Sequence, residues 1–544
     1  MGGEYARPIW MFLFLMLIHL VSALCPARCC CNDEALRAAC VGAGLEIVPI
    51  QLNPEVKHID LSNNKINTVH FTLRFYNNLI SLDISHNKVQ KLGSSNFASQ
   101  HNMKHLNLSH NEIVNLTRDS FKGLHSLTVL DLSFNRLDKL YNYAFKELQS
   151  LEILVLTGNQ IEYIDEGMLN TAKQLKELFL NDNQLLEVPV SAILECTNLQ
   201  IISLSHNLLQ SVDADGFPNL PQLKTLKLDN NVIDEIHPSA FSGLQFLESL
   251  DLSDNNFTSI PTASLAKLSH LRLLRLSGNF FVDIPPVAFR SLFELKYLRL
   301  DRLELLNKVH SRAFVDNIDL EKVWLDDNIG LSVIPTRLFH GNPRLIQISI
   351  RNCQLYSLEV PHFPLDQLKL LELGGNPLFC NCSLLWLWKL IQEQHVKPTT
   401  NGSEPYKLVI DSENIRCAEP EELTDVLLRD TFESQIGCSM GWIAAVSIAA
   451  SMMLIVGTIC VFLFCTPMKK RSPKKNLPTI EGTLPDVADE NHYEDLMVDK
   501  YIMGSSLAHE YKTLAPWQPY FTDGSDLNEQ HDQNVKTRPH IVYV

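Results

Sequence analysis

The stretch LTVLDLSFNRL at residues 127–137 decides the fold, because it recurs as LEILVLTGNQI at residues 151–161. Both copies read L-x-x-L-x-L-x-x-N-x-L, and Asn135 and Asn159 lie 24 residues apart. Most turns of this kind carry an asparagine at the same phase: Asn64, Asn87, Asn111, Asn135, Asn159, Asn183, Asn207, Asn231, Asn255, Asn279, Asn328 and Asn376. Cys353 replaces it in one turn and Leu303 in another. Such self-similarity predicts a solenoid of about fourteen turns.

The alternation within L-x-L predicts one short strand per turn, since neighbouring side chains of a strand point to opposite faces. No single turn buries its own leucines, so stacked turns share a continuous core. We expect an α/β solenoid of right-handed turns, bent into a horseshoe with a parallel sheet along its inner side. The buried asparagine should hydrogen-bond the backbone of a neighbouring turn. Leu303 lacks that amide, which predicts a local irregularity between Leu303 and Asn328.

A second apolar row is expected on the outer side of the solenoid. It consists of phenylalanines at one phase, mostly followed by leucine three residues later: Phe97, Phe121, Phe145, Phe217, Phe241, Phe289, Phe314 and Phe339. Packing alone explains leucine, phenylalanine and asparagine at these phases. The repeat therefore predicts the fold, whereas function has to be read from residues that the fold does not need.

The amino terminus has the pattern of a secretory signal peptide over residues 1–23. Arg7 precedes an apolar run at residues 9–21, which is too short to span a bilayer comfortably, and Val21 and Ala23 supply small residues for cleavage. Export to an oxidising compartment permits disulfide bonds.

Two cysteine clusters flank the repeats. They are CPARCCCNDEALRAAC at residues 25–40 and NPLFCNCSLLWLWKL at residues 376–390. These clusters resemble the terminal caps of extracellular leucine-rich repeat proteins, which implies caps at residues 24–55 and 376–438 around repeats at residues 56–375. Caps are needed because the end turns of a solenoid otherwise expose apolar core. The resemblance implies four disulfides: Cys25 with Cys31, Cys29 with Cys40, Cys380 with Cys417, and Cys382 with Cys438.

Three further cysteines lie in the first cap and the repeats. Cys196 and Cys353 fall at core phases, so both are predicted to be buried thiols. Cys30 stands outside the implied pairs. It is either a crowded free thiol of the cap or the site of an intermolecular disulfide.

Five N-x-S/T sequons predict N-glycosylation in an exported chain, at Asn107, Asn115, Asn256, Asn381 and Asn401. Asn107 falls on the inner strand face, where a glycan would mask part of that surface. Asn381 lies between two cap cysteines and is the poorest acceptor of the five.

Residues 441–465 form an uncharged apolar stretch that is long enough for one transmembrane helix. Basic residues follow it at once: Lys469, Lys470, Arg471, Lys474 and Lys475. The positive-inside rule then predicts a single-pass type I protein of the plasma membrane, with the repeats outside and the carboxy terminus in the cytoplasm. We expect these basic residues to contact anionic lipids of the bilayer.

The tail at residues 466–544 is polar and is expected to be disordered. Two tyrosine-x-x-hydrophobic motifs match those of endocytic adaptors, although this pattern is also common by chance. The carboxy-terminal hydrophobic-x-hydrophobic end matches a PDZ-domain ligand, with a frayed terminus as the alternative. These motifs comprise Tyr493, Leu496, Tyr511, Leu514, Val542 and Val544.

The residue between the two strand leucines faces out of the inner surface, so this column samples the expected binding face. Its first third is acidic, with Asp60, Asp83 and Asp131. Apolar residues follow, and then arginine and aromatic residues of the kind enriched in interface hot spots. The candidate ligand-binding residues are Val155, Phe179, Arg275, Tyr297, Arg299 and Trp324. The expected ligand is an extracellular protein or a second copy of the chain, whose acidic and basic ends would meet in an antiparallel pair.

Neither nucleic-acid binding nor catalysis is expected. A net charge of −16 gives an anionic polymer no attraction. The Ser-His-Asn triplets that end at Asn87, Asn111 and Asn207 belong to the repeat, and their histidines are spread along the solenoid rather than gathered on one metal ion. The sequence contains no convincing nucleotide-binding loop, zinc motif or nucleophile elbow. We therefore predict a non-enzymatic protein without a metal or cofactor.

The order of signal peptide, capped repeats, one span and short tail resembles single-pass leucine-rich repeat proteins of cell recognition, most closely the Capricious and Tartan group. The resemblance implies a receptor for cell adhesion or recognition that recruits cytoplasmic partners through its tail. The alternative is a modulatory co-receptor that captures a secreted ligand or regulates another receptor on the same membrane.

Overall fold

The computed structural model describes residues 25–69, 71–396, 408–437 and 440–465. The predicted signal peptide, the sequon at Asn401, Cys438 and all the tail motifs lie outside these residues. The repeat array and its caps fall within one compact unit, residues 1–457, and are described by themselves.

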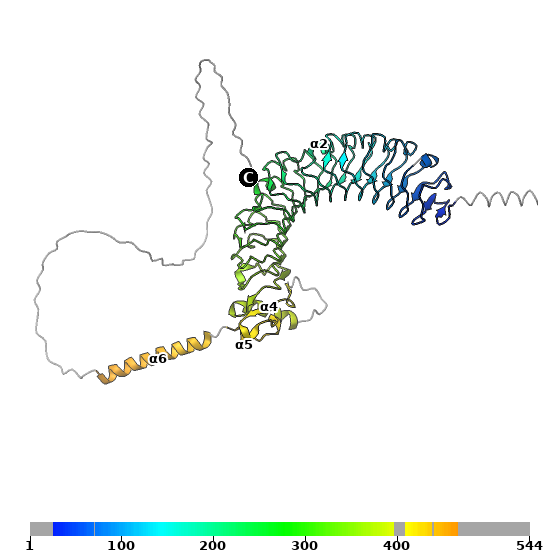
Figure 1. Ribbon diagram of the computed structural model, residues 1–544. Coiled ribbons are helices and arrows are strands. Elements are labelled where there is room, and N and C mark those ends of the chain that lie inside the picture. Colours follow the sequence, from blue (N-terminus) through cyan, green and yellow to red (C-terminus); the bar gives the residue numbers. More distant parts are fainter. Residues whose placement is uncertain (1–24, 70, 397–407, 438–439, 466–544) are drawn as a thin grey trace, which may run out of the picture. The chain divides into compact units, whose positions relative to one another are not determined.

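One sheet of 17 strands runs through the repeats and into both caps. Its strands lie along the inner side of the curved array in Figure 1. They are β1 (Cys30–Asn32), β2 (Arg37–Ala39), β3 (His58–Asp60), β4 (Ser81–Asp83), β5 (His105–Asn107), β6 (Val129–Asp131), β8 (Ile153–Val155), β10 (Glu177–Phe179), β11 (Ile201–Ser203), β13 (Thr225–Lys227), β15 (Ser249–Asp251), β16 (Leu273–Arg275), β18 (Tyr297–Arg299), β20 (Lys322–Trp324), β21 (Gln347–Ser349), β22 (Leu370–Glu372) and β24 (Val409–Ile410). The strands from β3 to β22 supply one strand per turn for fourteen turns, which confirms the predicted number.

The outer side of the repeats consists mainly of turns and two-residue strands. Parallel pairs form between β7 (Lys139–Leu140) and β9 (Tyr163–Ile164), β12 (Ser211–Val212) and β14 (Glu235–Ile236), and β17 (Asp283–Ile284) and β19 (Lys308–Val309). The helices in this region are η1 (Phe71–Phe75), α2 (Val190–Ile193), α3 (Thr262–Leu265) and η2 (Val360–His362). The helical part of the predicted α/β class is therefore wrong. A turn of this length bends sharply on its outer side, which leaves no straight stretch in which a helix gains several hydrogen bonds.

The ladder asparagines are buried and tie each turn to the one before it. The amide nitrogen of Asn159 donates to Leu132 O at 3.0 Å and to Leu156 O at 2.9 Å. Its Oδ1 accepts the N–H of Leu137 at 3.1 Å. Because these backbone groups have left the strand ladder, the side chain supplies the partners that burial requires. In the turn where Cys353 replaces the asparagine, Cys353 Sγ donates to Leu325 O at 3.2 Å.

The predicted irregularity near Leu303 is present on the segment that follows strand β18. Asn328 Oδ1 accepts the N–H of Leu303 itself at 2.7 Å, whereas Asn279 Oδ1 accepts the N–H of Phe257, two residues past the previous asparagine. Leu303 is fully buried in place of an amide. Strands β18 and β20 nevertheless pair in parallel with continuous register, so the break leaves the inner sheet unchanged.

The outer phenylalanine row is fully buried, as predicted. Rings of successive turns stack, with centroids 5.8 Å apart for Phe121 and Phe145 and 5.9 Å apart for Phe289 and Phe314. Three residues after Phe314, a buried amide replaces the usual leucine: Asn317 donates to Phe289 O at 2.9 Å. The amide thus supplies a second, outer link between turns.

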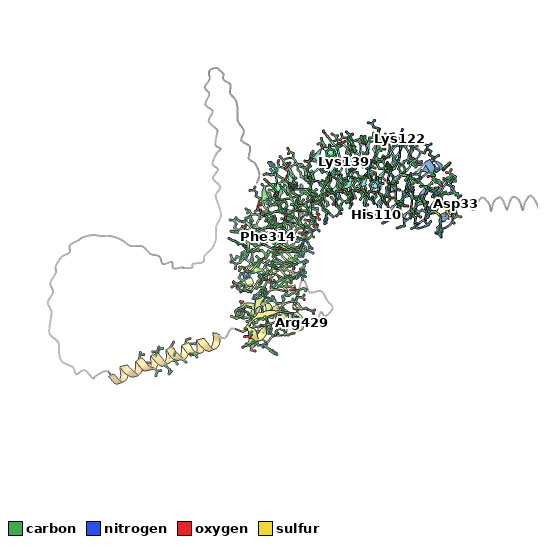
Figure 2. All side chains as sticks on the ribbon, in the orientation of Figure 1. Asp33, His110, Lys122, Lys139, Phe314 and Arg429 are labelled. Atoms are coloured by element: carbon green, nitrogen blue, oxygen red, sulfur yellow. A yellow bond between two sulfur atoms is a disulfide. The ribbon has the colours of Figure 1, made fainter. Side chains whose placement is uncertain are left out.

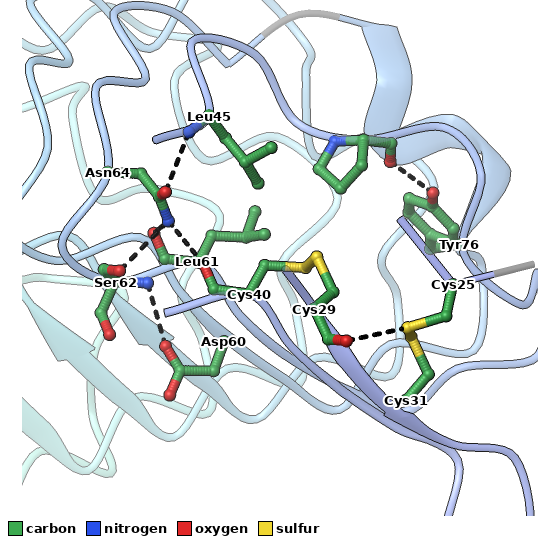
Figure 3. Close-up of a disulfide and its surroundings, with 11 residues drawn as sticks. Cys25, Cys29, Cys31, Cys40, Leu45, Asp60, Leu61, Ser62, Asn64 and Tyr76 are labelled. Atoms are coloured by element: carbon green, nitrogen blue, oxygen red, sulfur yellow. Dashed lines mark hydrogen bonds between the residues drawn. A yellow bond between two sulfur atoms is a disulfide. The ribbon is translucent and has the colours of Figure 1, made fainter. Parts of the chain in front are cut away.

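The amino-terminal cap is a hairpin that continues the main sheet. Strands β1 and β2 are antiparallel, and β2 pairs in parallel with β3. The cap contains the Cys25–Cys31 and Cys29–Cys40 disulfides that the resemblance implied (Figure 3). The first ladder asparagine joins the cap to the repeats, because the amide nitrogen of Asn64 donates to Cys40 O at 2.7 Å.

The carboxy-terminal cap covers the last turn with helix α4 (Leu385–Val396). The Cys380–Cys417 disulfide links the start of the cap to its distal part. Cys382 has no disulfide partner among the described residues, and its implied partner Cys438 lies outside them. The remaining cap elements are η3 (Cys382–Leu384), β23 (Leu378–Phe379) paired with β25 (Cys417–Glu419), η4 (Glu421–Leu423), η5 (Leu428–Asp430) and α5 (Glu433–Ile436).

Helix α6 (Met440–Cys465) covers the stretch predicted to span the membrane. The side chains described in it, at residues 446–459, are all exposed. Among the residues that the structure describes, no helix reaches the combined length and hydropathy expected of a bilayer crossing.

Candidate protein-binding face

Most strands of the main sheet present two side chains on the inner face. In β8, Leu154 is fully buried, while Ile153 and Val155 on either side of it are half-buried. The inner face therefore carries two columns of side chains, one at the first and one at the third residue of each strand. Of the six candidate ligand-binding residues predicted from the sequence, Tyr297 lies in the first column and the other five in the second.

The acidic residues of the second column have a structural role. Asp60, Asp83, Asn107, Asp131 and Asp251 each accept the backbone N–H of the residue two positions later, over 2.8–3.1 Å. Such a turn ends the strand and satisfies a backbone donor as the chain leaves the sheet. The fold itself thus explains aspartate or asparagine at this position.

Val155 and Phe179 occupy the same column without offering such an acceptor. No described side chain accepts the N–H groups of Thr157 and Asn181, which are the equivalent donors. The fold gains no strand-ending bond at these two turns. It instead places a half-buried valine and a half-buried phenylalanine on a column that is otherwise polar apart from Trp324.

Neighbouring residues of the first column extend these two into what we call the apolar cluster. Val129 lies in register with Ile153, and Val155 lies in register with Phe179. All members are half-buried and face outward from four adjacent strands, β6, β8, β10 and β11. The apolar cluster comprises Val129, Ile153, Val155, Phe179 and Ile201. Val129, Ile153 and Ile201 were missed from sequence, although reading the residue before each buried central strand residue would have found them.

One carboxylate lies within the apolar cluster. Glu177 is in register with Ile153 on one side and Ile201 on the other, two residues before Phe179. Its carboxylate forms no ion pair or hydrogen bond with any described residue. The cluster therefore surrounds an unpaired negative charge.

An aromatic stack lines the edge of the inner face beside the apolar cluster. The ring centroids of His86 and His110 are 4.1 Å apart, and those of His110 and Phe134 are 4.4 Å apart. Figure 2 shows His110 on the inner side of the array and Lys122 on the outer side. Burial lowers the pKa of His110, and neighbouring His86 lowers it further. The neutral form of the His110 imidazole is therefore favoured within the stack.

The predicted basic and aromatic residues come together farther along the sheet, on β16, β18 and β20. The guanidinium carbon of Arg299 lies 4.5 Å from the ring centroid of Trp324. Such a contact between a cation and an aromatic face is attractive. Strands β11, β13 and β15 separate this group from Phe179, so the six candidate ligand-binding residues form two groups rather than one patch.

The positive charges of this second group are balanced by neighbouring carboxylates. Arg275 lies 3.2 Å from Asp251, and Arg299 lies 3.7 Å from Asp301. Burial raises the pKa of Asp301. The end of the inner face predicted to be basic is thus electrically balanced, which removes the main attraction proposed for an antiparallel pair.

A further carboxylate closes this group at its outer edge. Lys296 donates to Glu321 at 2.7 Å, and Tyr297 Oη donates to the same carboxylate at 3.2 Å. The hydrogen bond from Lys296 lowers the pKa of Glu321. Tyr297 is consequently held against a residue of the next turn rather than left free.

The four described glycosylation sites fall into different environments. Asn115 and Asn256 are exposed. Asn107 is half-buried on β5 and donates to Asp83 at 2.9 Å. At the fourth described sequon, Asn381 Oδ1 accepts the N–H of Ser383 at the start of η3, which occupies the side chain.

The unpaired cysteines of the cap and repeats fall into two kinds. Cys196 and Cys353 are buried, and burial raises the pKa of each thiol to about 12. Cys30 is exposed. No group of three or more His, Cys, Asp or Glu suited to a metal ion occurs among the described residues.

Comparison with known proteins finds a repeat model that matches part of the chain. Residues 77–305 match six overlapping copies of the model described as leucine rich repeat, at residues 77–137, 125–185, 173–233, 197–257, 221–281 and 245–305. The human oligodendrocyte-myelin glycoprotein is 33% identical over 82 residues, which are 15% of this chain and 19% of that protein. Chicken (Gallus gallus) Tsukushi is 28% identical over 102 residues, covering 16% of this chain and 28% of its own length. The matched part thus spans less than a third of these relatives.

Solved structures with the same fold cover more of the chain at lower identity. A chain of the Toll–Spatzle complex, described as a hub in Drosophila development and innate immunity, has a TM-score of 0.54 at 22% identity, covering 72% of this chain and 59% of that one. A chain of the LRIM1/APL1C complex has a TM-score of 0.53 at 21% identity, covering 75% and 71%. A chain of the TLR13–ssRNA13 complex has a TM-score of 0.52 at 21% identity, covering 71% and 61%. Residues 77–305 of this chain thus match the leucine rich repeat model, and the solved structures share its fold.

Proposed function

We propose that this chain is a cell-surface receptor that binds an extracellular protein through the inner face of its solenoid, for cell adhesion or recognition. The apolar cluster is the observation that carries the proposal. Val155 and Phe179 take positions at which five other turns use a strand-ending aspartate or asparagine. Clustered outward apolar residues that do not serve the fold are typical of a binding surface.

A protein is favoured over a nucleic acid as the ligand. The net charge is −16, and Glu177 sits unpaired within the apolar cluster. An RNA would have to approach both without a matching cationic surface, although one structure of similar fold is described as a complex with single-stranded RNA. The Toll–Spatzle and LRIM1/APL1C structures are described as complexes between proteins.

Anchoring in the plasma membrane is part of the proposal. The support is the uncharged stretch 441–465, over which α6 extends, together with the basic residues that follow it. The apolar side chains at residues 446–459 are exposed in α6, and a bilayer would remove them from water. The amino terminus is then extracellular, and the tail motifs recruit endocytic or PDZ-domain partners in the cytoplasm.

The binding face favours recognition without catalysis. Recognition proteins require complementary surfaces rather than reacting groups. In the group on β16, β18 and β20, the residues with shifted pKa values, Lys296, Glu321 and Asp301, are engaged in ion pairs. We therefore propose that the chain is not an enzyme.

A co-receptor is the second candidate function. The observation that favours it is the separate aromatic group at Arg299 and Trp324, which would allow two proteins to occupy one inner face. In that case the chain would present a captured ligand to another receptor on the same membrane rather than join two cells.

Binding assays on intact cells test the proposal. Cells that display the full chain would be probed with a library of soluble extracellular proteins, including the repeats of this chain itself. A receptor for recognition predicts at least one binder, and it predicts that cells with the chain sort from, or cluster with, cells that carry the binder. A co-receptor predicts an altered response of a second receptor without any sorting. The absence of every binder would contradict both functions.

A further inference from the structure

We infer that the apolar cluster takes a protein partner that presents a lysine or arginine side chain among apolar ones, with the cation placed on Glu177. This inference rests on the proposed binding function of the inner face and specifies the chemistry of the partner. Three observations support it: the Glu177 carboxylate lacks a cationic partner, apolar side chains surround Glu177, and the other charges of the inner face are largely balanced.

Two other glutamates beside the main sheet have the cationic partner that Glu177 lacks. On the flank of the same sheet, Glu152 lies 2.9 Å from Lys176, and Glu248 lies 2.7 Å from Lys224. The partner in both pairs comes from an adjacent turn. Ile153 and Ile201 occupy the two adjacent-turn positions beside Glu177, so the chain supplies no cation there.

Docking on the apolar cluster would remove water from that carboxylate. Burying an unpaired charge is strongly unfavourable, and an apolar or acidic partner surface would therefore lose more than it gains. A basic side chain reverses the balance, because hydrogen bonds between ionised groups are the strongest available to proteins. The aliphatic stem of lysine or arginine also suits the surfaces of Ile153 and Phe179 on which it would lie.

Asp131 adds to the negative potential at the edge of the cluster. It is in register with Val155. The N–H and hydroxyl of Ser133 both donate to the same oxygen, Oδ1, at 2.8 and 2.6 Å. Its other carboxylate oxygen faces no described donor, which leaves it available to a cationic partner.

A second copy of this chain is a poor occupant of the cluster. Arg275 and Arg351 of the inner face are paired with Asp251 and Asp326, over 3.2 and 3.0 Å. Lys227 is exposed and makes no ion pair with the described residues, but its neighbours in register are Ser203 and Asp251 rather than apolar side chains. Two described cations of the inner face, Arg299 and Lys322, lie beside the rings of Trp324 and Tyr297, but Asp301 and Glu321 offset their charges. They are therefore less available to Glu177 than a free basic side chain of another protein.

A library of random disulfide-closed peptides displayed on phage is the probe that tests this inference. The library would be selected against the full chain purified in detergent, and single peptides would then be measured on variants. We expect enriched peptides to place lysine or arginine between apolar residues. We expect their affinity to fall about tenfold or more in Glu177→Gln, which keeps the shape of the side chain while removing its charge.

Glu187→Gln is the matched control, because Glu187 is exposed and lies outside the inner face in the same turn. Its affinity for the peptides should match that of the unmodified chain. Equal thermal unfolding of the two variants would show that both fold. The inference is overturned if enriched peptides lack a basic residue or if they bind Glu177→Gln with unchanged affinity. It is also overturned if no enriched peptide loses affinity in Phe179→Ser.

Failure of the inference and failure of the proposed function give different results. Suppose that an extracellular protein binds the displayed chain, loses binding in Phe179→Ser and keeps it in Glu177→Gln. The inner face is then a binding face, and only the basic nature of the partner is wrong. If basic peptides depend on Glu177 while no extracellular protein binds, the chemistry of the cluster stands and the proposed receptor function falls.

Discussion

The ring of Phe134 lies directly over Gly158 of the next turn. A Cβ atom added at Gly158 would come within 2.6 Å of the ring carbon Cδ1 of Phe134. Gly158 also has a φ of 69°, in the left-handed region that other residues rarely adopt. The edge of the inner face beside the apolar cluster is therefore fixed by a backbone conformation and a ring contact together.

Replacing Gly158 by alanine should displace Phe134 and destabilise the solenoid. The left-handed backbone alone costs an L-residue about 1–2 kcal/mol, and the clash with the ring adds to it. Gly341→Ala is the control, because its nearest atom would be Val315 Cα at 3.8 Å and its φ is not positive. Thermal and denaturant unfolding of both variants measures the difference. Equal stability of the two variants would show that the turn and ring adapt freely.

The ladder asparagines should each contribute strongly to stability. Asn159→Leu deprives Leu132 O, Leu156 O and the N–H of Leu137 of their side-chain partner. Since leaving a buried backbone group unpaired costs about 1–3 kcal/mol, we expect a loss of roughly 3 kcal/mol or more. The control is Gln160→Leu at the adjacent exposed position, which should change the free energy of unfolding little. A stable Asn159→Leu protein would contradict the role assigned to the ladder.

Stability should fall in mild acid because of His362. This side chain is buried, its Nδ1 accepts the N–H of Glu359 at 3.0 Å, and burial lowers its pKa from 6.5. The unfolded chain then binds the proton more readily than the folded one, so the contribution is complete above pH 6.5 and is lost as the pH falls toward the lower, folded pKa. His362→Gln should reduce the change in melting temperature between about pH 5 and 7. The comparison is with an exposed control, His340→Gln. Identical pH profiles of these two variants would exclude the effect.

The cysteines should differ sharply in their reactivity. Cys30 is exposed and should react with a maleimide in the native chain. Cys196 and Cys353 should not, because both are buried and the pKa of each thiol is raised to about 12. Mass spectrometry before and after unfolding checks this prediction. A Cys30 that resists labelling until a reductant is added would instead indicate the intermolecular disulfide, which a non-reducing gel would display as a dimer.

The sequence predicts the architecture well because each repeat specifies its own buried residues by their position in the period. Asn159 and Leu154 recur at a fixed period, and period alone places one in the ladder and the other in the core. The α/β class fails for the same reason, since the pattern specifies which residues are buried but not the path of the outer segment. Turns and two-residue strands such as β7 and β9 carry no distinctive apolar period of their own.

The binding face is predicted only in part, because its properties arise between turns. Val155 and Phe179 were found from a single column, whereas Glu177 acquires meaning only from the residues in register with it on β8 and β11. Charge balance is equally hidden in the sequence. Asp254 and Arg302 are 48 residues apart, yet they form two hydrogen bonds of 2.8 and 3.0 Å across the intervening turn. Such pairs depend on side-chain conformations that no linear pattern contains.

Masking the inner face with a glycan tests the central claim of a protein-binding face at the apolar cluster. Asp131→Asn creates the sequon Asn-Leu-Ser beside Val155, in the arrangement that natural Asn107 already has on β5. The variant in which Ser133 is also replaced by alanine lacks the sequon, so it separates the glycan from the loss of charge. Arg118→Asn creates the sequon Asn-Asp-Ser at an exposed position away from the inner strands and serves as the control.

The most direct measurement is the binding of soluble extracellular proteins to cells that display these three variants. Surface amounts would be matched, and glycan occupancy would be verified by a shift in mass. The account predicts a binder that is lost in Asp131→Asn, is retained in Arg118→Asn, and returns at least partly when Ser133→Ala removes the sequon. A binder that is unaffected by a glycan at position 131, or that is lost only with the glycan at position 118, would contradict it.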